Sequence, residues 1–387
     1  MGKDPSISAC SGDVVVIGAG LVGLATAFEL AERGASVRVY DRGEPAGAAS
    51  WAGAGMLAPY TERIESEALL AFCAASLAQY PEFVRRIYDA GGVDVHLRLD
   101  GVIYAAFDSA ALDGLREHGA QLARRGVASS VLDRSSALRA EPWLGPAIVG
   151  ALLKAGEGHV DNRRLGRALV AACRTRGVRV ETAASIEVEC DARRVRGVRT
   201  DAGFVGAGAV VNACGAWASQ LRGVPPDCIA PVEPVKGQML ALAVPAGFVH
   251  RATWVPGVYL VPRDDGRLLL GATVESAGFD ERVTAQGMRE LLDAALIAAP
   301  GLAGFSITEQ WAGLRPGTPD GLPFVGPTPL DGFWLATGHY RNGILLAPAT
   351  ARSIADAIES GDPAPLLPFA IARLGTEEAA PARMSHA

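Results

Sequence analysis

The chain has 387 residues, of which 49% are hydrophobic and 20% are charged, and it contains 46 glycines. This composition excludes a mainly disordered chain and, because the glycines have no period of three, a collagen-like one. The formal net charge of -6 argues against a nucleic-acid surface and a polybasic membrane anchor, so we expect neither nucleic acid nor a membrane as partner.

The chain carries no pattern of a targeting segment, a membrane span or a metal site. No apolar run reaches the ~20 residues that cross a bilayer, and the residues before Asp13 lack the basic and apolar regions of a signal peptide. The six cysteines have no CxxC spacing, and the six histidines have no metal-binding spacing. We therefore expect a cytoplasmic protein with reduced thiols, no metal and, from its length, two domains.

The first regular pattern is a βαβ unit. Residues 13–17 and 36–40 are short β-branched runs typical of buried parallel strands. Residues 24–33 between them have the apolar spacing of a helix that ends at Gly34. The small residues over 47–59 have no regular period, which is typical of close approach between the backbone and a ligand or another element.

The turn between the first strand and the helix carries a GxGxxG pattern. Gly18 permits a tight turn, Gly20 lets the backbone approach a pyrophosphate, and Gly23 lets the helix pack closely. The helix N-terminus offers free N–H groups and a partial positive charge to phosphates. Asp41 ends the second strand, where a carboxylate can bind ribose hydroxyls. These features predict a dinucleotide site, but FAD and NAD share the fingerprint.

The rest of the chain alternates between α/β and α+β patterns. Helices are predicted over 66–90, 108–126, 162–177 and 284–299, with a closing helix around 354–358 that ends near Gly361. Strands are predicted over 101–107, 178–180, 208–212, 258–262, 267–271 and 333–336, with a hairpin turn from Asp264 to Gly266. The tail beyond Leu367 is rich in proline, alanine and glutamate, and we expect it to fray.

Seven segments spread over nearly the whole chain carry a resemblance. They are residues 14–42, 48–59, 158–161, 235–238, 259–263, 311–320 and 338–348. In this order they resemble the D-amino-acid oxidase superfamily of FAD-dependent amine oxidoreductases and, within it, the glycine oxidases of thiazole (thiamine) biosynthesis. The last two segments are the most specific to that family.

The pattern of elements and the resemblance together predict the fold class α/β plus α+β. A Rossmann-like FAD-binding domain is interleaved with a substrate domain built on a mixed, largely antiparallel sheet. The expected ranges are 12–60, 150–225 and 320–365 for the FAD-binding domain, 61–149 and 226–319 for the substrate domain, and 366–387 for a C-terminal tail.

The resemblance implies noncovalent FAD, since no cysteine lies in the flavin-ring segment 338–348. A helix start in that segment would stabilise the negative charge of a reduced flavin. Trp51, Trp217 and Trp311 are interpreted as core or cofactor-wall residues. The implied FAD-binding residues are Gly18, Gly20, Leu21, Val22 and Gly23 in the phosphate turn, Asp41 and Arg42 beside the ribose, Ala49, Ser50, Ala54, Gly55 and Met56 along the flavin, Ser185 near the adenine, and His339, Tyr340, Arg341, Asn342, Gly343, Ile344 and Leu345 under the ring.

Three side chains are candidates for the substrate site. Arg315 offers a planar, bidentate partner for an amino-acid carboxylate, and its motif favours this role over the alternative of a surface arginine. Tyr259 lies beside the expected hairpin and can donate to the same carboxylate; the alternative is a core tyrosine. Arg341 resembles a second arginine near the substrate entrance, or else it has a structural role in the flavin loop.

These residues imply an FAD-dependent oxidase of glycine that gives an imine, then glyoxylate and ammonia, with dioxygen reduced to hydrogen peroxide. No strong side-chain base is required, because a neutral amine already favours hydride loss. Sarcosine and D-alanine are expected to overlap with glycine as substrates. The alternatives are a D-amino-acid or N-methyl-amino-acid oxidase, a dehydrogenase with another acceptor, and a flavin-binding subunit of a larger complex. A homo-oligomer stays open.

Overall fold

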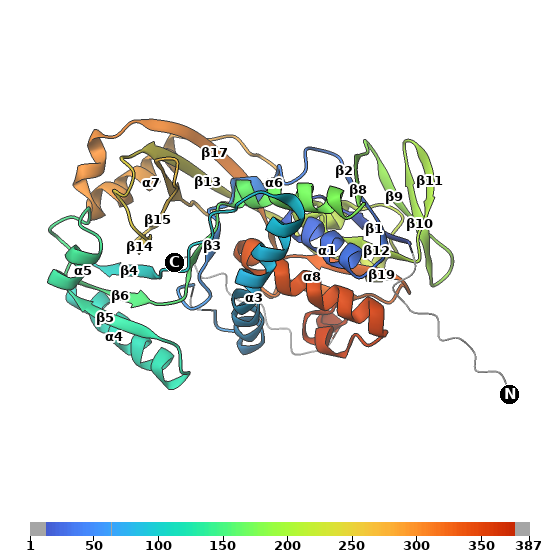
Figure 1. The fold of residues 1–387 in the computed structure, drawn as a ribbon, viewed down its shortest axis with the longest axis horizontal. Helices are drawn as coiled ribbons and strands as arrows, with labels where there is room; N and C mark the ends of the chain where they lie inside the picture. The colour runs from blue at the N-terminus through green and yellow to red at the C-terminus, as the bar shows by residue number, and fades with distance from the viewer. Residues whose placement is uncertain (1–12, 63, 376–387) are drawn as a thin grey trace.

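The computed structural model describes residues 13–62 and 64–375. Its elements gather around two large sheets that lie toward opposite ends of an elongated molecule (Figure 1). The long strands β13 and β17 run from one end toward the other, and the early and late parts of the chain meet in the helical layer (Figure 1).

The first sheet has six strands in the order β18-β19-β12-β1-β2-β8. Its strands are parallel except for β18, which pairs antiparallel with β19. A mainly parallel sheet with both faces covered explains why β1 is a continuous apolar run. The strands are β1 (Asp13–Ile17), β2 (Ser36–Asp41), β8 (Arg179–Thr182), β12 (Ala209–Asn212), β18 (Phe324–Pro327) and β19 (Phe333–Thr337).

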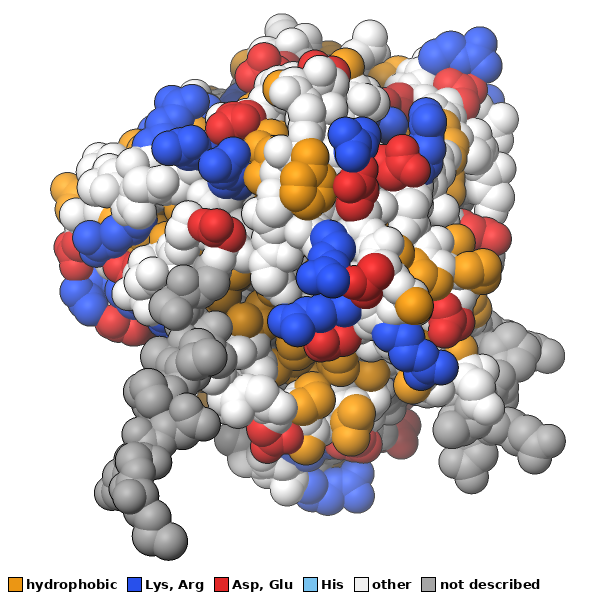
Figure 2. All heavy atoms as spheres, turned by 90° about the vertical axis from the view of Figure 1, so that its right-hand side faces the viewer, with side chains coloured by type: hydrophobic (Ala, Val, Ile, Leu, Met, Phe, Trp, Pro, Cys, Tyr) orange, Lys and Arg blue, Asp and Glu red, His pale blue; other side chains and the backbone are white. Residues whose placement is uncertain are grey.

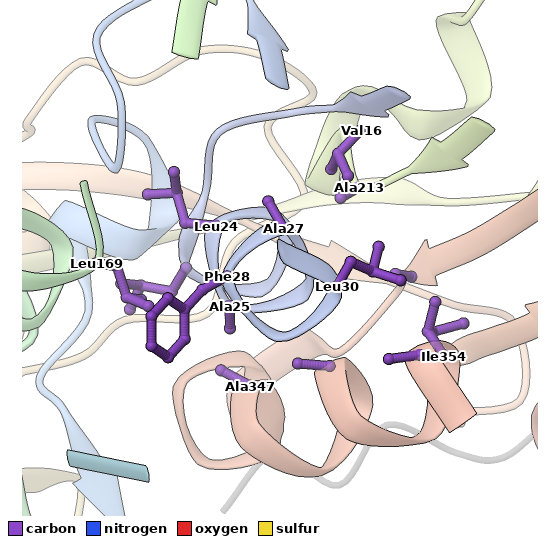
Figure 3. Packing of buried hydrophobic residues seen from close by; sticks show 14 of the residues in the cluster. Val16, Leu24, Ala25, Ala27, Phe28, Leu30, Leu169, Ala213, Ala347 and Ile354 are labelled. Carbon is purple, nitrogen blue, oxygen red and sulfur yellow. The ribbon is translucent and has the colours of Figure 1, made fainter. Parts of the chain in front are cut away.

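Helices cover one face of this sheet, and a small three-stranded sheet covers the other. Val14 and Val16 of β1 face the helices, whereas Val15 and Ile17 face the small sheet, as the period of two in a strand requires. Figure 3 shows the side chains of α1 packed between Val16 and α8. The covering elements are α1 (Leu21–Glu32), α3 (Glu67–Gly91), α6 (Asn162–Thr175), α8 (Gly343–Ser360), and the strands β9 (Ile186–Cys190), β10 (Val195–Thr200) and β11 (Gly203–Gly206).

The surface at the β9–β11 end mixes charges of both signs. Figure 2 shows acidic and basic side chains interspersed over this face. Ion pairs such as Arg196–Asp191 and Arg199–Glu189 account for part of the mixture. Within the described part of the chain, no helix combines the length and the apolar character needed to cross a membrane.

The second sheet has eight strands in the order β17-β13-β16-β15-β14-β4-β6-β5. All of its pairs are antiparallel except the pair of β14 with β4. The strands are β4 (Val102–Ala106), β5 (Ser129–Asp133), β6 (Gly150–Lys154), β13 (Glu233–Ala243), β14 (Ala252–Val255), β15 (Val258–Pro262), β16 (Arg267–Gly271) and β17 (Ile307–Gly317). The expected turn before Gly266 joins β15 to β16, and Gly266 has the positive φ of +85° that favours glycine there.

The two faces of this sheet have different neighbours. Leu291 and Ala295 of α7 (Ala285–Ala298) pack on one face against leucines of β13 and β16. The other face, which includes Met239, Trp254 and Trp311, packs against the small residues of the 52–58 segment. The short helices α4 (Ser109–Arg124) and α5 (Arg134–Ala140) lie at the β5 edge. The second sheet therefore forms a wall against the segment that carries the small residues.

The structure differs from the sequence-based expectations in three segments. Residues 150–154, expected in the FAD-binding domain, form β6 of the eight-stranded sheet, because β6 pairs with β4 and β5. Helix α3, expected in the substrate domain, buries its apolar side against α8 and α6 under the six-stranded sheet. The domain boundaries themselves stay a prediction.

The start of the C-terminal tail is packed, which corrects the expectation that it frays. Residues 364–369 and 371–375 form 3-10 turns, and Leu366 and Phe369 are buried. The ring of Phe369 stacks on Phe72 of α3 at 5.0 Å between centroids. Apolar burial therefore holds this part of the chain against the helices, and the rest of the expected tail lies outside the described residues.

Candidate active site

A cavity of about 900 Å³ lies between the two sheets. This volume is near the upper end of the ~300–1,000 Å³ typical of ligand sites. Its walls include the carboxyl ends of β1, β2 and β19 on one side and residues of β13, β15 and β17 on the other. Ligands of open α/β sheets bind outside the carboxyl ends of the strands, so the cavity has the position expected for a nucleotide.

The glycine-rich turn at one end of the cavity is shaped for close approach. Gly18 has φ of +108°, and a Cβ there would lie 2.3 Å from the carbonyl oxygen of Ala213. A Cβ on Gly23 would lie 1.9 Å from the carbonyl oxygen of Gly18, so Gly23 is required for packing of the helix on the turn. A Cβ on Gly20 would meet only the Ser50 hydroxyl at 3.2 Å. Gly20 therefore leaves room beside the helix start.

The N-terminus of α1 faces this room, and no side chain of the helix or its N-cap residue caps it. The N-cap Gly20 offers no side-chain cap, and the first turn carries no acidic residue. The amide N–H of Leu21 donates to Ser50 Oγ at 2.9 Å. The remaining partial positive charge of the helix end suits an anionic group such as a pyrophosphate.

Asp41 and Arg42 line the same part of the cavity. The Asp41 carboxylate accepts from the amide N–H of Ala19 at 2.6 Å and from that of Gly43 at 2.9 Å. Each carboxylate oxygen retains a lone pair for a hydroxyl of a ligand. The Arg42 guanidinium lies over the ring of Trp217, 4.3 Å from its centroid, so this arginine is part of a stacked wall.

The small-residue segment forms α2 (Ala49–Ala52) and β3 (Met56–Leu57), although the sequence showed no period there. Three of its carbonyl groups accept hydrogen bonds from side chains of other segments. Asn162 Nδ2 donates to the carbonyl of Ser50 at 2.8 Å, Arg263 Nη2 donates to that of Ala54 at 2.7 Å, and Trp311 Nε1 donates to that of Ala52 at 2.9 Å. These bonds fix the backbone of a segment whose residues line the cavity, where their small size leaves room for a flat ring.

A second helix N-terminus closes the cavity near its middle. Helix α8 begins at Gly343 without a side-chain cap and without an acidic residue in its first turn. The preceding His339 is buried, and its Nε2 lies 3.0 Å from the Thr350 hydroxyl. Burial lowers the pKa of His339 to about 3, so the ring is neutral at pH 7. The positive charge of this wall therefore comes from the N-terminus of α8 and from Arg341, and not from His339.

The two buried histidines predict an acid-sensitive fold. Burial also lowers the pKa of His159 to about 3, whereas an unfolded histidine titrates near 6.5. Between about pH 6.5 and pH 3 each histidine is protonated in the unfolded chain and neutral in the folded chain. The free energy of unfolding therefore falls as pH falls, by about 1.4 kcal/mol per pH unit for each histidine. We expect His339→Gln to flatten the decline of Tm below pH 6.5, measured by calorimetry. An equal effect of replacing the exposed His250 would contradict this explanation.

Arg315, Tyr259 and Arg341, the three side chains expected at the substrate, lie near one another in the wall of the cavity. Arg315 Nη1 donates to the carbonyl of Thr273 at 3.1 Å, and its guanidinium lies against Gly237, where any Cβ would be 2.4 Å from it. The Tyr259 hydroxyl lies 3.9 Å from Met239 Sδ, and burial raises the pKa of Tyr259. Among the described residues, no carboxylate forms an ion pair with Arg315 within 4.0 Å, so its charge faces the cavity.

The structure places the predicted FAD residues as follows. Gly23, Asn342 and Leu345 are not among the residues that line the cavity: Gly23 packs on Gly18, Asn342 is the N-cap of α8, and Leu345 is buried in the helical core. Their contact with the cofactor stays a prediction. The residues that do line it are Gly18, Gly20, Leu21, Val22, Asp41, Arg42, Ala49, Ser50, Ala54, Gly55, Met56, Ser185, His339, Tyr340, Arg341, Gly343 and Ile344.

Several residues of the wall lie outside the motifs that the sequence indicated. Glu62, Tyr104 and Trp254 line the cavity, although none of them belongs to a predicted motif. Trp254 Nε1 is buried and has no hydrogen-bond partner among residues 13–62 and 64–375. The only sequence signal for Glu62 is its position just after the small-residue segment. Tyr104 and Trp254 come from neighbouring strands β4 and β14, a pairing that no local pattern reveals.

The fold and the cavity define a class of protein: a mainly parallel α/β sheet with a dinucleotide-type glycine turn, joined to a second sheet across a large ligand cavity. A match to the family "FAD dependent oxidoreductase" covers residues 13–357. The chain belongs to this family, and FAD is its cofactor. The cavity fits that group, since the Gly20 side of the turn and two uncapped helix ends leave room and positive charge for it.

The relatives agree with this membership. The chain is 37% identical to a glycine oxidase of Pseudomonas putida, with 92% of this chain and 98% of the relative covered. It is 38% identical to the bifunctional protein ThiO/ThiG of a Synechocystis species, covering 92% of this chain and 53% of that protein. The crystal structure of glycine oxidase from Geobacillus kaustophilus superposes with a TM-score of 0.88 at 34% identity, covering 94% of this chain and 98% of the other.

Proposed function

We propose that this FAD-dependent enzyme oxidises glycine to the imine, which hydrolyses to glyoxylate and ammonia, as a step of thiamine biosynthesis. The observation that carries the proposal is the Arg315 guanidinium, whose charge faces the cavity at the end away from the phosphate turn. A planar guanidinium pairs bidentately with a carboxylate. The glycine oxidase of P. putida, similar over nearly its whole length, supports glycine as substrate.

The protein's part in the reaction is to orient the substrate. Arg315 and Tyr259 hold the carboxylate, and this grip aims the Cα–H bond at the small-residue wall formed by the 49–56 segment. Arg341 sits at the same end and guides the anion into the cavity. When bound, FAD supplies the acceptor for the Cα hydride, and dioxygen takes the electrons on to hydrogen peroxide. Positioning and the amine lone pair carry the chemistry without a strong side-chain base.

The FAD contacts follow from the walls of the cavity. The N-terminus of α1 and Gly20 would receive the pyrophosphate, Asp41 would receive the ribose hydroxyls, and Ser185 would lie near the adenine. The N-terminus of α8 would supply partial positive charge to the flavin, which would favour the reduced, negative form. FAD is held noncovalently, because the cavity wall in 338–348 contains no cysteine.

The substrate range includes the neighbours of glycine in size. A hydrophobic pocket discriminates one methylene by only ~1–3 kcal/mol, so sarcosine and D-alanine are further substrates of the same site. The enzyme acts in the cytoplasm, a setting consistent with the free thiols of Cys73, Cys173, Cys190, Cys214 and Cys228. Whether copies of the chain assemble into a homo-oligomer does not alter this chemistry.

Anaerobic addition of glycine to the purified yellow protein tests the proposal. We expect the flavin absorbance near the visible maximum to bleach, and we expect peroxide and glyoxylate to form once air is admitted. Bleaching without peroxide would instead indicate a dehydrogenase with another acceptor. No bleaching with glycine, sarcosine or D-alanine would overturn the function, as would a wide preference for large D-amino acids over glycine.

A further inference from the structure

Glu62 brings a carboxylate to the substrate end of the cavity. It lines the cavity together with Arg315, Arg341 and Tyr259. Burial raises the pKa of Glu62, and the charges of Arg341 and Arg315 partly offset that rise. The Glu62 carboxylate likewise acts on the pKa of Tyr259 and of Arg341. The acid is therefore close enough to interact with each side chain proposed for the substrate.

A buried ion cluster fixes the segment that carries Glu62. Glu157, fully buried, accepts from the amide N–H of Tyr60 at 2.6 Å and of Thr61 at 3.1 Å, and from the Thr61 hydroxyl. Lys154, also fully buried, donates to Thr61 Oγ1 at 2.9 Å. The Glu62 amide itself donates to the carbonyl of Ala58. Because buried charges are costly unless they are paired, this cluster holds the backbone in one arrangement.

The charges at this end of the cavity match an amino acid better than a simple acid. Two guanidinium groups and one carboxylate face the space that the substrate enters. A zwitterion places its carboxylate on Arg315 and its ammonium group against an anion, and the ammonium group gives up a proton to solvent before its lone pair assists hydride loss. A carboxylic acid without an amine fills the first position and adds a second negative charge beside Glu62.

We propose that Glu62 binds the amine of the substrate and makes the site selective for amino acids over carboxylic acids that lack an amine. This inference rests on the proposed function and adds its amine-recognising residue. Sites built to hydrogen-bond a substrate group reject analogues without it, because the partner in the protein is then left unpaired. The amine held between Glu62 and the carboxylate grip also fixes the rotation of the Cα–N bond, so Glu62 is a specificity-determining and positioning residue.

The test compares binding of glycine with binding of glycolate and acetate in the FAD-loaded enzyme. Glycolate has a hydroxyl in place of the amine, and acetate has neither. Their Kd values come from the shift of the flavin absorbance on titration, and that of glycine comes from rapid anaerobic mixing. In Glu62→Gln we expect glycine to bind about 10- to 100-fold more weakly, the range for a hydrogen bond to a charged group. We expect glycolate and acetate to bind as well as before or more tightly.

A control substitution shows whether the effect depends on losing the carboxylate inside the cavity or on losing any carboxylate nearby. Glu65 lies three residues further on and is exposed, and it lies outside the cavity wall. We expect Glu65→Gln to keep the glycine-to-glycolate ratio of the unchanged enzyme. Glu62→Asp keeps the charge and shortens the side chain, so its glycine-to-glycolate ratio should lie between those of Glu62→Gln and the unchanged enzyme. It also tests the inference if Glu62→Gln fails to fold.

The outcomes distinguish this inference from the proposed function. In one outcome, glycine reduces the unchanged enzyme, and the ratio of the glycine Kd to the glycolate Kd is the same in both Glu62 variants. This outcome overturns the role of Glu62 and leaves the proposed function intact. An equal loss of glycine, glycolate and acetate in Glu62→Gln overturns it too, because that pattern indicates a distorted pocket. An unchanged enzyme that glycine does not reduce overturns the proposed function itself.

Discussion

Replacing Arg315 with leucine is expected to lower kcat/KM for glycine by about 10³-fold. The change removes the cation proposed for the substrate carboxylate, and truncating one partner of a buried charge pair costs about 2–5 kcal/mol, or roughly 4 kcal/mol for a 10³-fold effect. Most of the loss should persist at saturating glycine, because the same grip orients the Cα–H bond. Steady-state rates of peroxide formation over a range of glycine concentrations measure both effects.

Two further variants make the Arg315 prediction specific. Arg315→Lys keeps the charge but loses the bidentate geometry, so we expect it to recover only part of the lost activity. Arg282 is an exposed arginine of the segment before α7 that pairs with Asp280, and Arg282→Leu should keep full activity. Turnover by Arg315→Leu within tenfold of the unchanged enzyme would contradict the substrate assignment.

The parts of the fold that local sequence determines could be predicted. The β1–α1–β2 unit, the β15–β16 hairpin and the helices capped by Ser66, Asp161 and Thr284 depend on short-range spacing and capping, and the structure contains them. The side chains of these three caps accept from backbone N–H groups three residues later.

The parts that depend on distant pairing could not be predicted. Nothing local to residues 150–154 distinguishes a strand of the first sheet from one of the second, since the register with β4 decides it. The same applies to α3, whose apolar stripe fits either half of the molecule, and to the tail that Phe369 anchors on Phe72. Long-range contacts of this kind carry no short-range signature.

The residues of the candidate site also divide into those that local sequence indicates and those that only the fold brings to the cavity. The glycines of the turn and Arg315 lie in motifs, so the sequence indicated them. Glu62 reaches the cavity only because Glu157, 95 positions further along the chain, holds the backbone before it. A buried carboxylate with two arginines nearby is recognisable once the chain is folded, and its chemistry is then evident.

The two glycines of the phosphate turn should separate folding from cofactor binding. In Gly23→Ala the new Cβ meets the backbone carbonyl of Gly18 at 1.9 Å, and neither backbone can yield without moving β1 or α1. We expect the free energy of unfolding of the FAD-free protein to fall by about 2–3 kcal/mol, as for other overpacked positions. Denaturant titration followed by far-UV circular dichroism measures this.

Gly20→Ala is the matched variant, since the substitution is the same and the position is three residues away. Gly20 has φ of -70° and ψ of 175°, which alanine adopts freely, and its Cβ would meet only the Ser50 hydroxyl. The FAD-free protein should therefore keep its stability within about 1 kcal/mol. The added methyl group occupies the space in which the pyrophosphate approaches the backbone, so the Kd for FAD should rise about 10- to 100-fold (about 1.4–2.8 kcal/mol).

The pair is informative because Gly23→Ala is expected to lower the stability of the FAD-free protein, whereas Gly20→Ala is expected to weaken FAD binding. A Gly20→Ala protein that is unstable without FAD would mean that the turn needs this glycine for its own conformation. A Gly20→Ala protein that binds FAD as tightly as the unchanged one would mean that the pyrophosphate lies elsewhere along the cavity, and the open N-terminus of α1 would then need another anionic partner.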